Sequence, residues 1–218
     1  MPRIVRPLRT LVGQTDRVSP TNLLGLVASG LSMFFIWPQV LRVYRKDTVE
    51  GLAPFGALQG MSGSLLWSIY GFARGDIPLF GSNLLLAIAI SLLGVAMTRH
   101  GVLPRATLPG VALIVLCTGL TAVALSTALV GVLAFLIGTS SVLPQTFKVL
   151  CDPDLAGVSV SSNSLLFVTS TAWLTYGLAI GDTLVWLPNL LIIPCSALIV
   201  AKARVSQRRT ASTPVHAF

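Results

Sequence analysis

The sequence predicts an all-α membrane protein whose seven transmembrane helices form two parallel three-helix bundles joined by a linker helix (3+1+3). Three observations predict this fold. First, 54% of the residues are hydrophobic and only 10% are charged, whereas about one quarter of a soluble domain is charged. Second, the apolar residues form seven runs, each about long enough to cross a hydrocarbon core of about 30 Å. Third, the first three runs and the last three share a repeated motif.

The repeated motif is Trp-x-x-Tyr-Gly, followed by Gly-Asp and then by Asn. It begins at Trp67 and again at Trp173, 106 positions downstream. The same offset aligns further residues without a gap: Pro38-Gln39 with Pro144-Gln145, Gly51 with Gly157, and Ser64 with Ser170. Apolar bias does not generate repeated Trp, Tyr, Pro, Gln, Asn and Asp. We therefore interpret the match as an internal duplication.

The chain divides into five expected segments. A basic arm comes first and lacks the apolar region and cleavage site of a secretory signal. The segments are the arm, 1–21; a first triple-helix repeat, 22–98; the linker helix, 99–128; a second triple-helix repeat, 129–202; and a basic tail, 203–218. The spans must be helical because lipid cannot satisfy an open backbone. We expect them near 22–44, 54–73, 77–98, 108–127, 129–150, 160–180 and 183–202.

The fourth span has no counterpart in either repeat. Each repeat holds three spans, and because three is odd, two repeats joined directly would lie inverted in the membrane. One additional span restores the same orientation. We therefore interpret 108–127 as a linker helix, and Ser126-Thr127 is the single polar signal at its far end.

Lysine and arginine predict that the N-terminus lies outside and the C-terminus inside. In that orientation the inner segments hold 10 basic residues and the outer segments, including the four arginines of the arm, hold 5. The net charge of +8 thus reflects membrane topology, and we expect no nucleic-acid partner. The frequent use of arginine and the short length favour the plasma (cytoplasmic) membrane of a bacterium.

Enzymatic and metal-binding functions are disfavoured. Cys117, Cys151 and Cys195 are scattered, and we interpret them as free thiols. His100 and His216 are isolated from any carboxylate or cysteine at ligand or catalytic spacing. We therefore expect no enzyme, no metal and no cofactor.

Four residues are candidates for a substrate pocket. Trp67 and Trp173 lie late in the second span of each repeat, and Asn83 and Asn189 lie early to middle in the third. Facing the central axis, they would offer amides to hydroxyl groups and indole faces to the C–H face of a sugar ring. Alternatively, each Asn bonds a neighbouring helix backbone and each Trp belongs to the interfacial aromatic belt. The residues alone leave both interpretations open.

Serine residues accompany the tryptophans. Ser64 and Ser170 each lie three positions before a Trp, on the same helical face. They could line the pocket, but we favour hydroxyls that bond back to their own helix.

A second set of residues lies nearer the outer side. Tyr70 and Tyr176 follow each Trp by three positions, and Asp76 and Asp182 lie in the next turn. They could form an outer gate with Arg74 as a counter-charge. Interfacial tyrosines and turn-forming Gly-Asp pairs are the alternative.

Prolines mark possible hinges. Pro38 and Pro144 each remove a hydrogen bond within a helix, and Gln39 and Gln145 could bond the carbonyls thus freed. Pro54 begins the second span of the first repeat, whereas valine stands at the equivalent position of the second. We therefore expect the second unit to bend less.

These motifs resemble the SWEET and SemiSWEET sugar carriers. Pro-Gln near the end of the first helix of each unit is the signature of PQ-loop proteins. The pattern of Trp-x-x-Tyr-Gly followed by Asp and Asn is similar to that of the carrier family. The basic loop at 45–51 is similar to the short loop that follows the first helix in that family. The resemblance covers both triple-helix units. It implies a carrier that moves mono- or disaccharides down their gradient by alternating access, without a cofactor. It also implies that Trp67, Asn83, Trp173 and Asn189 contact the substrate and that the Pro-Gln helices form an inner hinge.

The absence of charged residues from the spans indicates whether transport is coupled to a proton gradient. No Asp, Glu, Lys, Arg or His falls deep inside any expected span, whereas a proton-coupled carrier normally needs an ionisable group there. A neutral substrate and uncoupled transport are therefore favoured. One alternative is a PQ-loop carrier of another small polar metabolite or amino acid. Another, from a different class, is a seven-helix receptor or cargo-binding protein. A homo-oligomer is possible.

Overall fold

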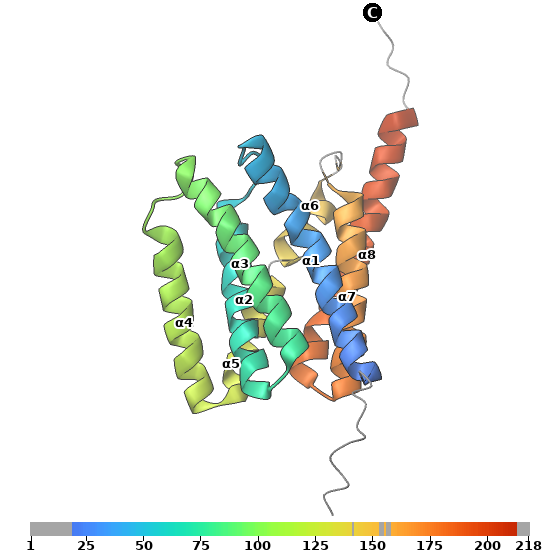
Figure 1. Cartoon of the computed structure of the whole chain (residues 1–218). Helices are drawn as coiled ribbons and strands as arrows, with labels where there is room; N and C mark the ends of the chain where they lie inside the picture. The colour runs from blue at the N-terminus through green and yellow to red at the C-terminus, as the bar shows by residue number, and fades with distance from the viewer. Residues whose placement is uncertain (1–18, 141, 153–154, 156–157, 213–218) are drawn as a thin grey trace, which may run out of the picture.

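A computed structural model describes residues 19–140, 142–152, 155 and 158–212, and the described part is helical without a β-strand (Figure 1). The predicted all-α class is confirmed. The helices are α1 (Pro20–Lys46), α2 (Pro54–Arg74), α3 (Ile77–Arg99), α4 (Thr107–Leu125), α5 (Thr127–Ser140), α6 (Val142–Cys151), α7 (Val160–Ile180) and α8 (Thr183–Ser212).

The helices correspond to the seven predicted spans, because α5 and α6 together occupy the fifth. Five of the spans, namely α1, α3, α4, α5 with α6, and α8, are long and apolar enough to cross a membrane. The other two are α2 and α7, which carry the Trp-x-x-Tyr-Gly motif together with several Ser, Thr and Gly residues. Their lower apolar content reflects the polar residues that they contribute to the interior of the protein.

A tight turn joins the second and third helices of each repeat. Gly75 and Gly181 end α2 and α7 with φ angles of 66° and 68°, in the left-handed region that glycine adopts without strain. The aspartate that follows begins the next helix. Asp76 Oδ1 accepts a hydrogen bond from Leu79 N at 2.9 Å, and Asp182 Oδ1 accepts one from Leu184 N at 3.1 Å. The repeated Gly-Asp pair thus ends one helix and caps another.

The glycine of the Trp-x-x-Tyr-Gly motif allows the two helices of each hairpin to approach closely. A Cβ atom on Gly71 would lie 2.6 Å from Phe80 N, and one on Gly177 would lie 2.7 Å from Trp186 N. Both neighbours are backbone atoms, so a side chain would have to push the helices apart.

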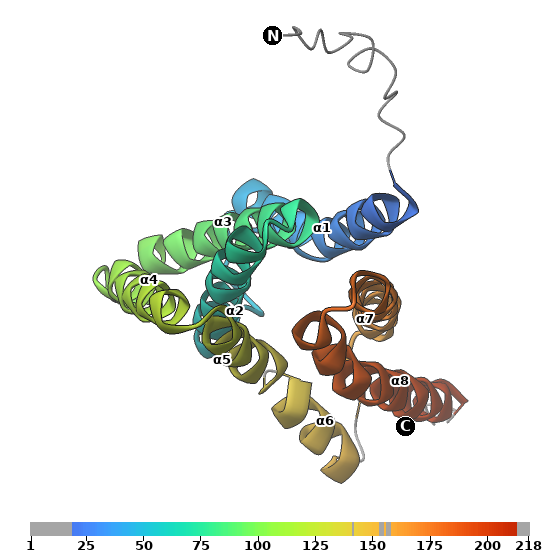
Figure 2. The same ribbon diagram turned by 90° about the horizontal axis from the view of Figure 1, so that it is seen from below.

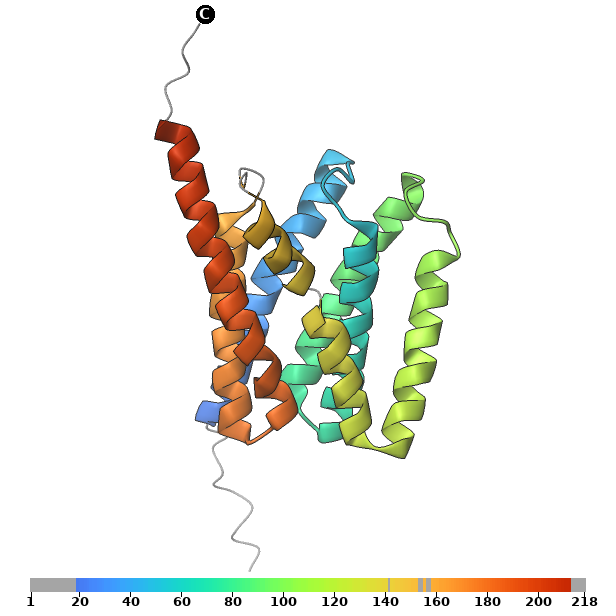
Figure 3. The same ribbon diagram turned by 180° about the vertical axis from the view of Figure 1, so that it is seen from behind.

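In each unit the third helix lies between the first two. Helix α3 packs against both α1 and α2, and α8 packs against both α6 and α7 (Figure 2). The two units meet crosswise, with α1 against α7 and α2 against α5, as expected for two copies related by an approximate axis. Helix α4 lies at the periphery and packs mainly on α2 and α5 (Figure 3).

The two ends of the bundle differ in charge. We call the end at which α2 turns into α3 the Tyr-Asp end, and the opposite end, at which α1 finishes, the Pro-Gln end. Helix α1 begins at the Tyr-Asp end and α8 finishes at the Pro-Gln end (Figure 1). Among the described lysines and arginines, Arg74 alone lies at the Tyr-Asp end.

One expected boundary differs in the structure. The tail predicted to begin at 203 is helical to Ser212 as part of α8. Gln207 explains part of this extension, because its Nε2 donates to the carbonyls of Leu155 and Val158 at 3.1 and 2.9 Å. The fifth span comprises α5 and α6, and residue 141 between them lies outside the described residues.

Some expectations lie outside the described residues. These are the N-terminal arm up to position 18, including its arginines, the end of the tail after 212, and Gly157.

We expect Gly71→Ala to lower the free energy of unfolding by about 1–3 kcal/mol, because the new methyl group overlaps the backbone of α3. Thermal unfolding of the purified protein in detergent measures this change. Gly81→Ala in α3 is the matched control, because a Cβ atom there meets nothing within 4 Å. Equal melting temperatures for the two variants would contradict the close approach.

Candidate functional site

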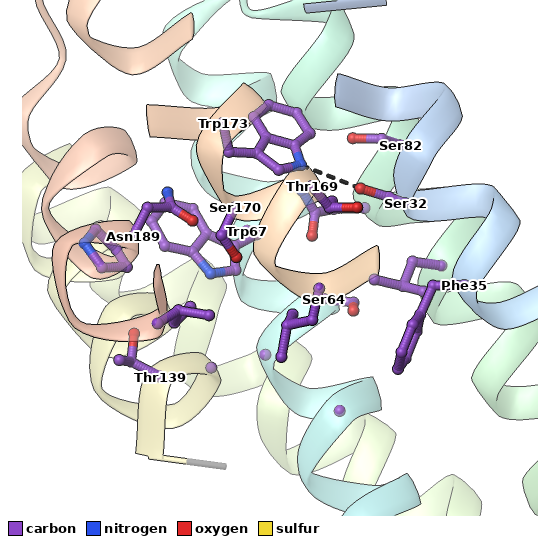
Figure 4. Close-up of a pocket in the computed structure, with 18 of the residues that line it drawn as sticks. Ser32, Phe35, Ser64, Trp67, Ser82, Thr139, Thr169, Ser170, Trp173 and Asn189 are labelled. Atoms are coloured by element: carbon purple, nitrogen blue, oxygen red, sulfur yellow. Dashed lines mark hydrogen bonds between the residues drawn. The ribbon is translucent and has the colours of Figure 1, made fainter. Parts of the chain in front are cut away.

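A cavity of about 340 Å³ lies between the two units. Residues of α1, α2, α3, α5, α7 and α8 line it, so both units contribute to its wall (Figure 4). The volume falls near the lower end of the range of roughly 300–1,000 Å³ that small-molecule sites occupy.

All four residues that the sequence analysis singled out as pocket candidates line this one cavity. They are Trp67, Asn83, Trp173 and Asn189. The cavity thus carries two indoles and two amides from equivalent positions of the duplicated units. None of the described residues that line it is charged.

The two asparagine amides are held in the same way. Asn83 Nδ2 donates to the carbonyl of Leu79, and Asn189 Nδ2 donates to the carbonyl of Val185, both at 2.9 Å. These are bonds within one helix, not the bonds to a neighbouring helix considered above. Within the described residues neither Oδ1 accepts a hydrogen bond, so each amide keeps an acceptor and a second N–H for a ligand.

The two indoles are held differently. Trp173 Nε1 donates to Ser32 Oγ at 3.0 Å (Figure 4). The position equivalent to Ser32 is Gly138, where a Cβ atom would lie 3.2 Å from Trp67 Nε1. One indole is therefore fixed by a hydrogen bond, whereas the other packs against a glycine.

Within the described part of the chain, three hydroxyl groups of the cavity wall lack protein partners. Ser64 and Ser170 are buried and line the cavity, and within the described residues neither bonds back to its own helix. This differs from the interpretation that we favoured. Thr169 Oγ1 is also buried without a hydrogen-bond partner in the described part of the chain. A buried hydroxyl of this kind is costly unless water or a ligand satisfies it.

Sequence reasoning missed Thr169 because the duplication conceals it. It lies one helical turn before Trp173, but the equivalent position of the first unit is Gly63. A search for residues shared by both copies therefore passes over it. Ser32 was missed for the same reason.

Two crossed hydrogen bonds join the units at the Tyr-Asp end. Tyr70 Oη donates to Asp182, with distances of 2.7 and 2.9 Å to its two carboxylate oxygens. Tyr176 Oη donates to Asp76 Oδ1 at 2.8 Å. Arg74 Nε also pairs with Asp182 Oδ2 at 3.2 Å. Each aspartate therefore caps a helix and also accepts a hydrogen bond from a tyrosine of the opposite unit. The turn-forming Gly-Asp pair and the contact between tyrosine and carboxylate, which the sequence analysis treated as alternatives, thus occur together.

Glycines on the first helix of each unit make room for the tyrosines. A Cβ atom on Gly25 would lie 2.8 Å from the ring of Tyr176, and one on Gly131 would lie 2.8 Å from the ring of Tyr70. Gly25 and Gly131 are also 106 positions apart. The offset could therefore have identified them, although the sequence alone did not show what they contact.

The Pro-Gln helices stand apart at the other end. Among the described residues, α1 contacts α3 and α7 but neither α5 nor α6. The cavity wall reaches toward this end through Phe35 and Ile36 of α1. Among the described residues, tyrosine–aspartate hydrogen bonds thus join the units at the Tyr-Asp end, whereas α1 and α6 make no contact at the Pro-Gln end.

The glutamine residues behave differently from expectation. Pro38 lies inside α1, and Pro144 lies in α6. Within the described residues neither Gln39 nor Gln145 forms a hydrogen bond, so the proposed bonds to freed carbonyls are not present. The expectation that the second unit bends less stays a prediction. Pro54 occupies the first turn of α2, where proline is favoured.

The described residues contain no group of three or more His, Cys, Asp or Glu side chains that could hold a metal ion. The three cysteines are free.

Comparisons with known proteins agree with this architecture. A family model described as "PQ loop repeat" matches residues 21–80. The protein named "Sugar transporter SemiSWEET" from Leptospira biflexa serovar Patoc is 29% identical over 72 residues, which span 33% of this chain and 85% of that protein. A solved structure described as a eukaryotic SWEET transporter matches with a TM-score of 0.69 and 16% identity. The match covers 86% of this chain and 99% of that one.

The first unit of the chain thus matches the PQ-loop repeat. Together the three findings support the SWEET and SemiSWEET family, as the sequence motifs predicted. The matched proteins are named as transporters, so the prediction that the chain is not an enzyme is also confirmed.

We expect Tyr70→Phe to destabilise the protein more than Tyr176→Phe. The first variant removes a donor from Asp182, which is only 6% exposed, and a buried acceptor that loses its donor costs about 1–3 kcal/mol. Asp76 is less buried, so water replaces the lost hydroxyl more readily. Melting temperatures of the two variants in detergent test the order, and a larger loss for Tyr176→Phe would contradict it.

Proposed function

We propose that this protein carries sugars across a membrane by alternating access, without coupling to an ion gradient. The observation that carries the proposal is the uncharged central cavity, with one indole and one amide from each of the two duplicated units. The similarity to a protein named as a sugar transporter supports the substrate class. The likeness to a SWEET transporter structure supports the fold.

The chemistry of the cavity suits a sugar. A sugar presents hydroxyl groups around its rim and C–H groups on its faces. Asn83 and Asn189 supply amide donors and acceptors for the hydroxyl groups. Trp67 and Trp173 supply flat apolar surfaces for the C–H faces. Ser64, Ser170 and Thr169 add hydroxyls that lack protein partners within the described residues.

The lack of ionisable groups among the described residues that line the cavity supports uncoupled transport. A proton-coupled carrier binds its proton on an intramembrane carboxylate, histidine or similar group. The described residues that line the cavity include no such group. The nearest carboxylates belong to the Tyr-Asp end, where they are already bonded to tyrosines and helix N-termini.

The two ends of the molecule suit alternating access. In the present form the crossed bonds of Tyr70 and Tyr176 act as an outer gate, with Arg74 as counter-charge. The opposite form would require these bonds to break and the Pro-Gln helices to approach. Bundles that rock around a fixed central site produce such an exchange in carriers built from repeats. Pro38 and Pro144 supply compliant points for the inner hinge.

The charge distribution supports an orientation in the membrane. The described basic residues other than Arg74 lie toward the Pro-Gln end, so we assign this end to the cytoplasm and the N-terminus to the outside. We further assign the protein to the plasma membrane. One chain contains both units of the pathway, so a homo-oligomer is not needed to complete it.

We expect saturable uptake of labelled glucose or sucrose into proteoliposomes, independent of an imposed pH gradient. Asn189→Ala should reduce uptake at least about tenfold, because a lost amide leaves substrate hydroxyls unpaired in a closed site. Asn163→Ala is a matched control. Asn163 also donates to its own helix at 2.9 Å and is buried, but it does not line the cavity.

Each alternative has a distinct result in this assay. Uptake driven by the pH gradient would overturn uncoupled transport. Absence of sugar uptake by folded protein would exclude the sugar and favour another small polar solute. Equal losses in Asn189→Ala and Asn163→Ala would remove Asn189 from the binding site.

We expect Thr169→Val to raise KM for the transported sugar about two- to tenfold without lowering the melting temperature. Valine keeps the shape of the side chain but removes a hydroxyl that has no protein partner in the described residues, so folding loses no hydrogen bond. Uptake kinetics and thermal unfolding of the same preparation measure both quantities. A fall in stability with unchanged KM would assign Thr169 to packing alone.

A further inference from the structure

The two indoles of the cavity have the same packing within their units. In each unit the tryptophan ring stands nearly perpendicular to the ring of the tyrosine one turn later. The ring centroids of Trp67 and Tyr70 are 5.7 Å apart at an interplanar angle of 80°. Those of Trp173 and Tyr176 are 5.6 Å apart at 79°. Aromatic pairs prefer this edge-to-face arrangement, so the duplicated scaffold holds both indoles at equivalent angles to the tyrosines.

The ring nitrogens of the two indoles differ in their partners. Trp173 Nε1 donates to Ser32 Oγ at 3.0 Å, and Ser32 Oγ donates in turn to the carbonyl of Ala28 at 3.0 Å. Because Ser32 belongs to α1, the contact joins one unit to the other (Figure 4). Within the described residues Trp67 Nε1 has no hydrogen-bond partner. It is also accessible, since Thr169 Oγ1 is the only unpaired side-chain N or O atom there that is fully buried.

A single difference between the copies accounts for this asymmetry. The position equivalent to Ser32 is Gly138, 106 residues downstream. Glycine has no hydroxyl that could accept the indole N–H. A Cβ atom on Gly138 would lie 3.2 Å from Trp67 Nε1, so a side chain at this position would stand beside that nitrogen. Serine in one unit and glycine in the other therefore engage one indole N–H and leave the other without an acceptor in the described residues.

We infer that Ser32 is a positioning residue that gives the two indoles different roles in substrate binding. Ser32 engages the N–H of Trp173 and holds its ring in place, so that Trp173 offers its flat face to the C–H groups of the sugar. Trp67 keeps its N–H, which can only donate, for an oxygen atom of the sugar. The sugar therefore binds in one orientation although the motif is repeated. The inference rests on the proposed function, but its structural part can be tested without a substrate.

The structural test is the exchange of the indole N–H protons with solvent, followed by NMR on protein that contains isotope-labelled tryptophan. Trp67→Phe and Trp173→Phe assign the two signals. We expect the Trp173 proton to exchange about three- to tenfold more slowly than the Trp67 proton, because one hydrogen bond typically contributes this much. Ser32→Ala should remove the protection, and Ser32→Thr, which keeps the hydroxyl, should retain it.

A matched control removes a similar hydroxyl without touching an indole. Ser62 Oγ donates to the carbonyl of Leu58 at 2.8 Å, which is the same bond within a helix that Ser32 forms with Ala28. Ser62 does not line the cavity. We therefore expect Ser62→Ala to change neither the exchange rate of the Trp173 proton nor the kinetics of uptake.

Sugar uptake tests the two roles. Ser32→Ala should raise KM about two- to tenfold with little change in the maximal rate, since a less ordered indole weakens binding. Ser32→Thr should restore KM. Gly138→Ser and Gly138→Ala both add a Cβ atom beside Trp67 Nε1, but only serine adds a hydroxyl that can accept its N–H. We therefore expect Gly138→Ser to raise KM more than Gly138→Ala does.

The results separate this inference from the proposed function. Equal exchange of the two protons in the wild type, or unchanged protection of Trp173 in Ser32→Ala, overturns the inference even if the protein transports sugar. Lost protection in Ser32→Ala together with an absence of uptake by the wild type supports the positioning role and rejects the substrate. A raised KM in Ser32→Ala with Trp173 still protected overturns the inference and assigns Ser32 to direct contact with the sugar. Equal KM values for the two Gly138 variants overturn the role of the Trp67 N–H.

Discussion

The crossed tyrosine–aspartate bonds are the contacts on which the relation between the two units depends. Each buried tyrosine finds its acceptor on the opposite unit, so neither unit satisfies its own hydroxyl. The position of each accepting carboxylate is fixed within its own unit, because the aspartate also caps the helix that follows it. The two rings fit only because Gly25 and Gly131 leave no side chain in their way. A turn residue, a cap and a small residue on a distant helix thus act together.

The duplicated scaffold carries a cavity that is not symmetric. Where α7 meets α1, Trp173 bonds Ser32, and the unpaired hydroxyl of Thr169 lies on the same side. Where α2 meets α5, glycines occupy the equivalent positions, and Gly63 and Gly138 pack directly together. Asn83 and Asn189 keep equivalent amides on both sides of the cavity, whereas Ser32 and Thr169 have glycine at the equivalent positions. The copies therefore keep the same packing but differ in side-chain chemistry.

The sequence predicted the features that both copies share. The motif offset predicted the two units, and the apolar runs predicted the spans, because these signals repeat or extend over many residues. The hydrogen bond from Gln59 Nε2 of α2 to the carbonyl of Ile137 of α5 was not predicted, because it joins residues 78 positions apart and leaves no periodic signal. Similarly, Ser64 and Ser170 could bond their own helices or face the cavity, and only packing decides between these states.

The modest apolar content of α2 and α7 has a consequence for biosynthesis. A helix enters the bilayer from the translocon according to its own transfer free energy, and hydroxyl and amide groups make that energy less favourable. Of the helices that line the cavity, α2 and α7 are therefore the two that lipid accepts least readily on their own. Each is followed, after a turn of two residues, by a strongly apolar helix, α3 or α8. The tight Gly-Asp turn lets each pair insert as a helical hairpin, in which the second helix carries the first into the membrane.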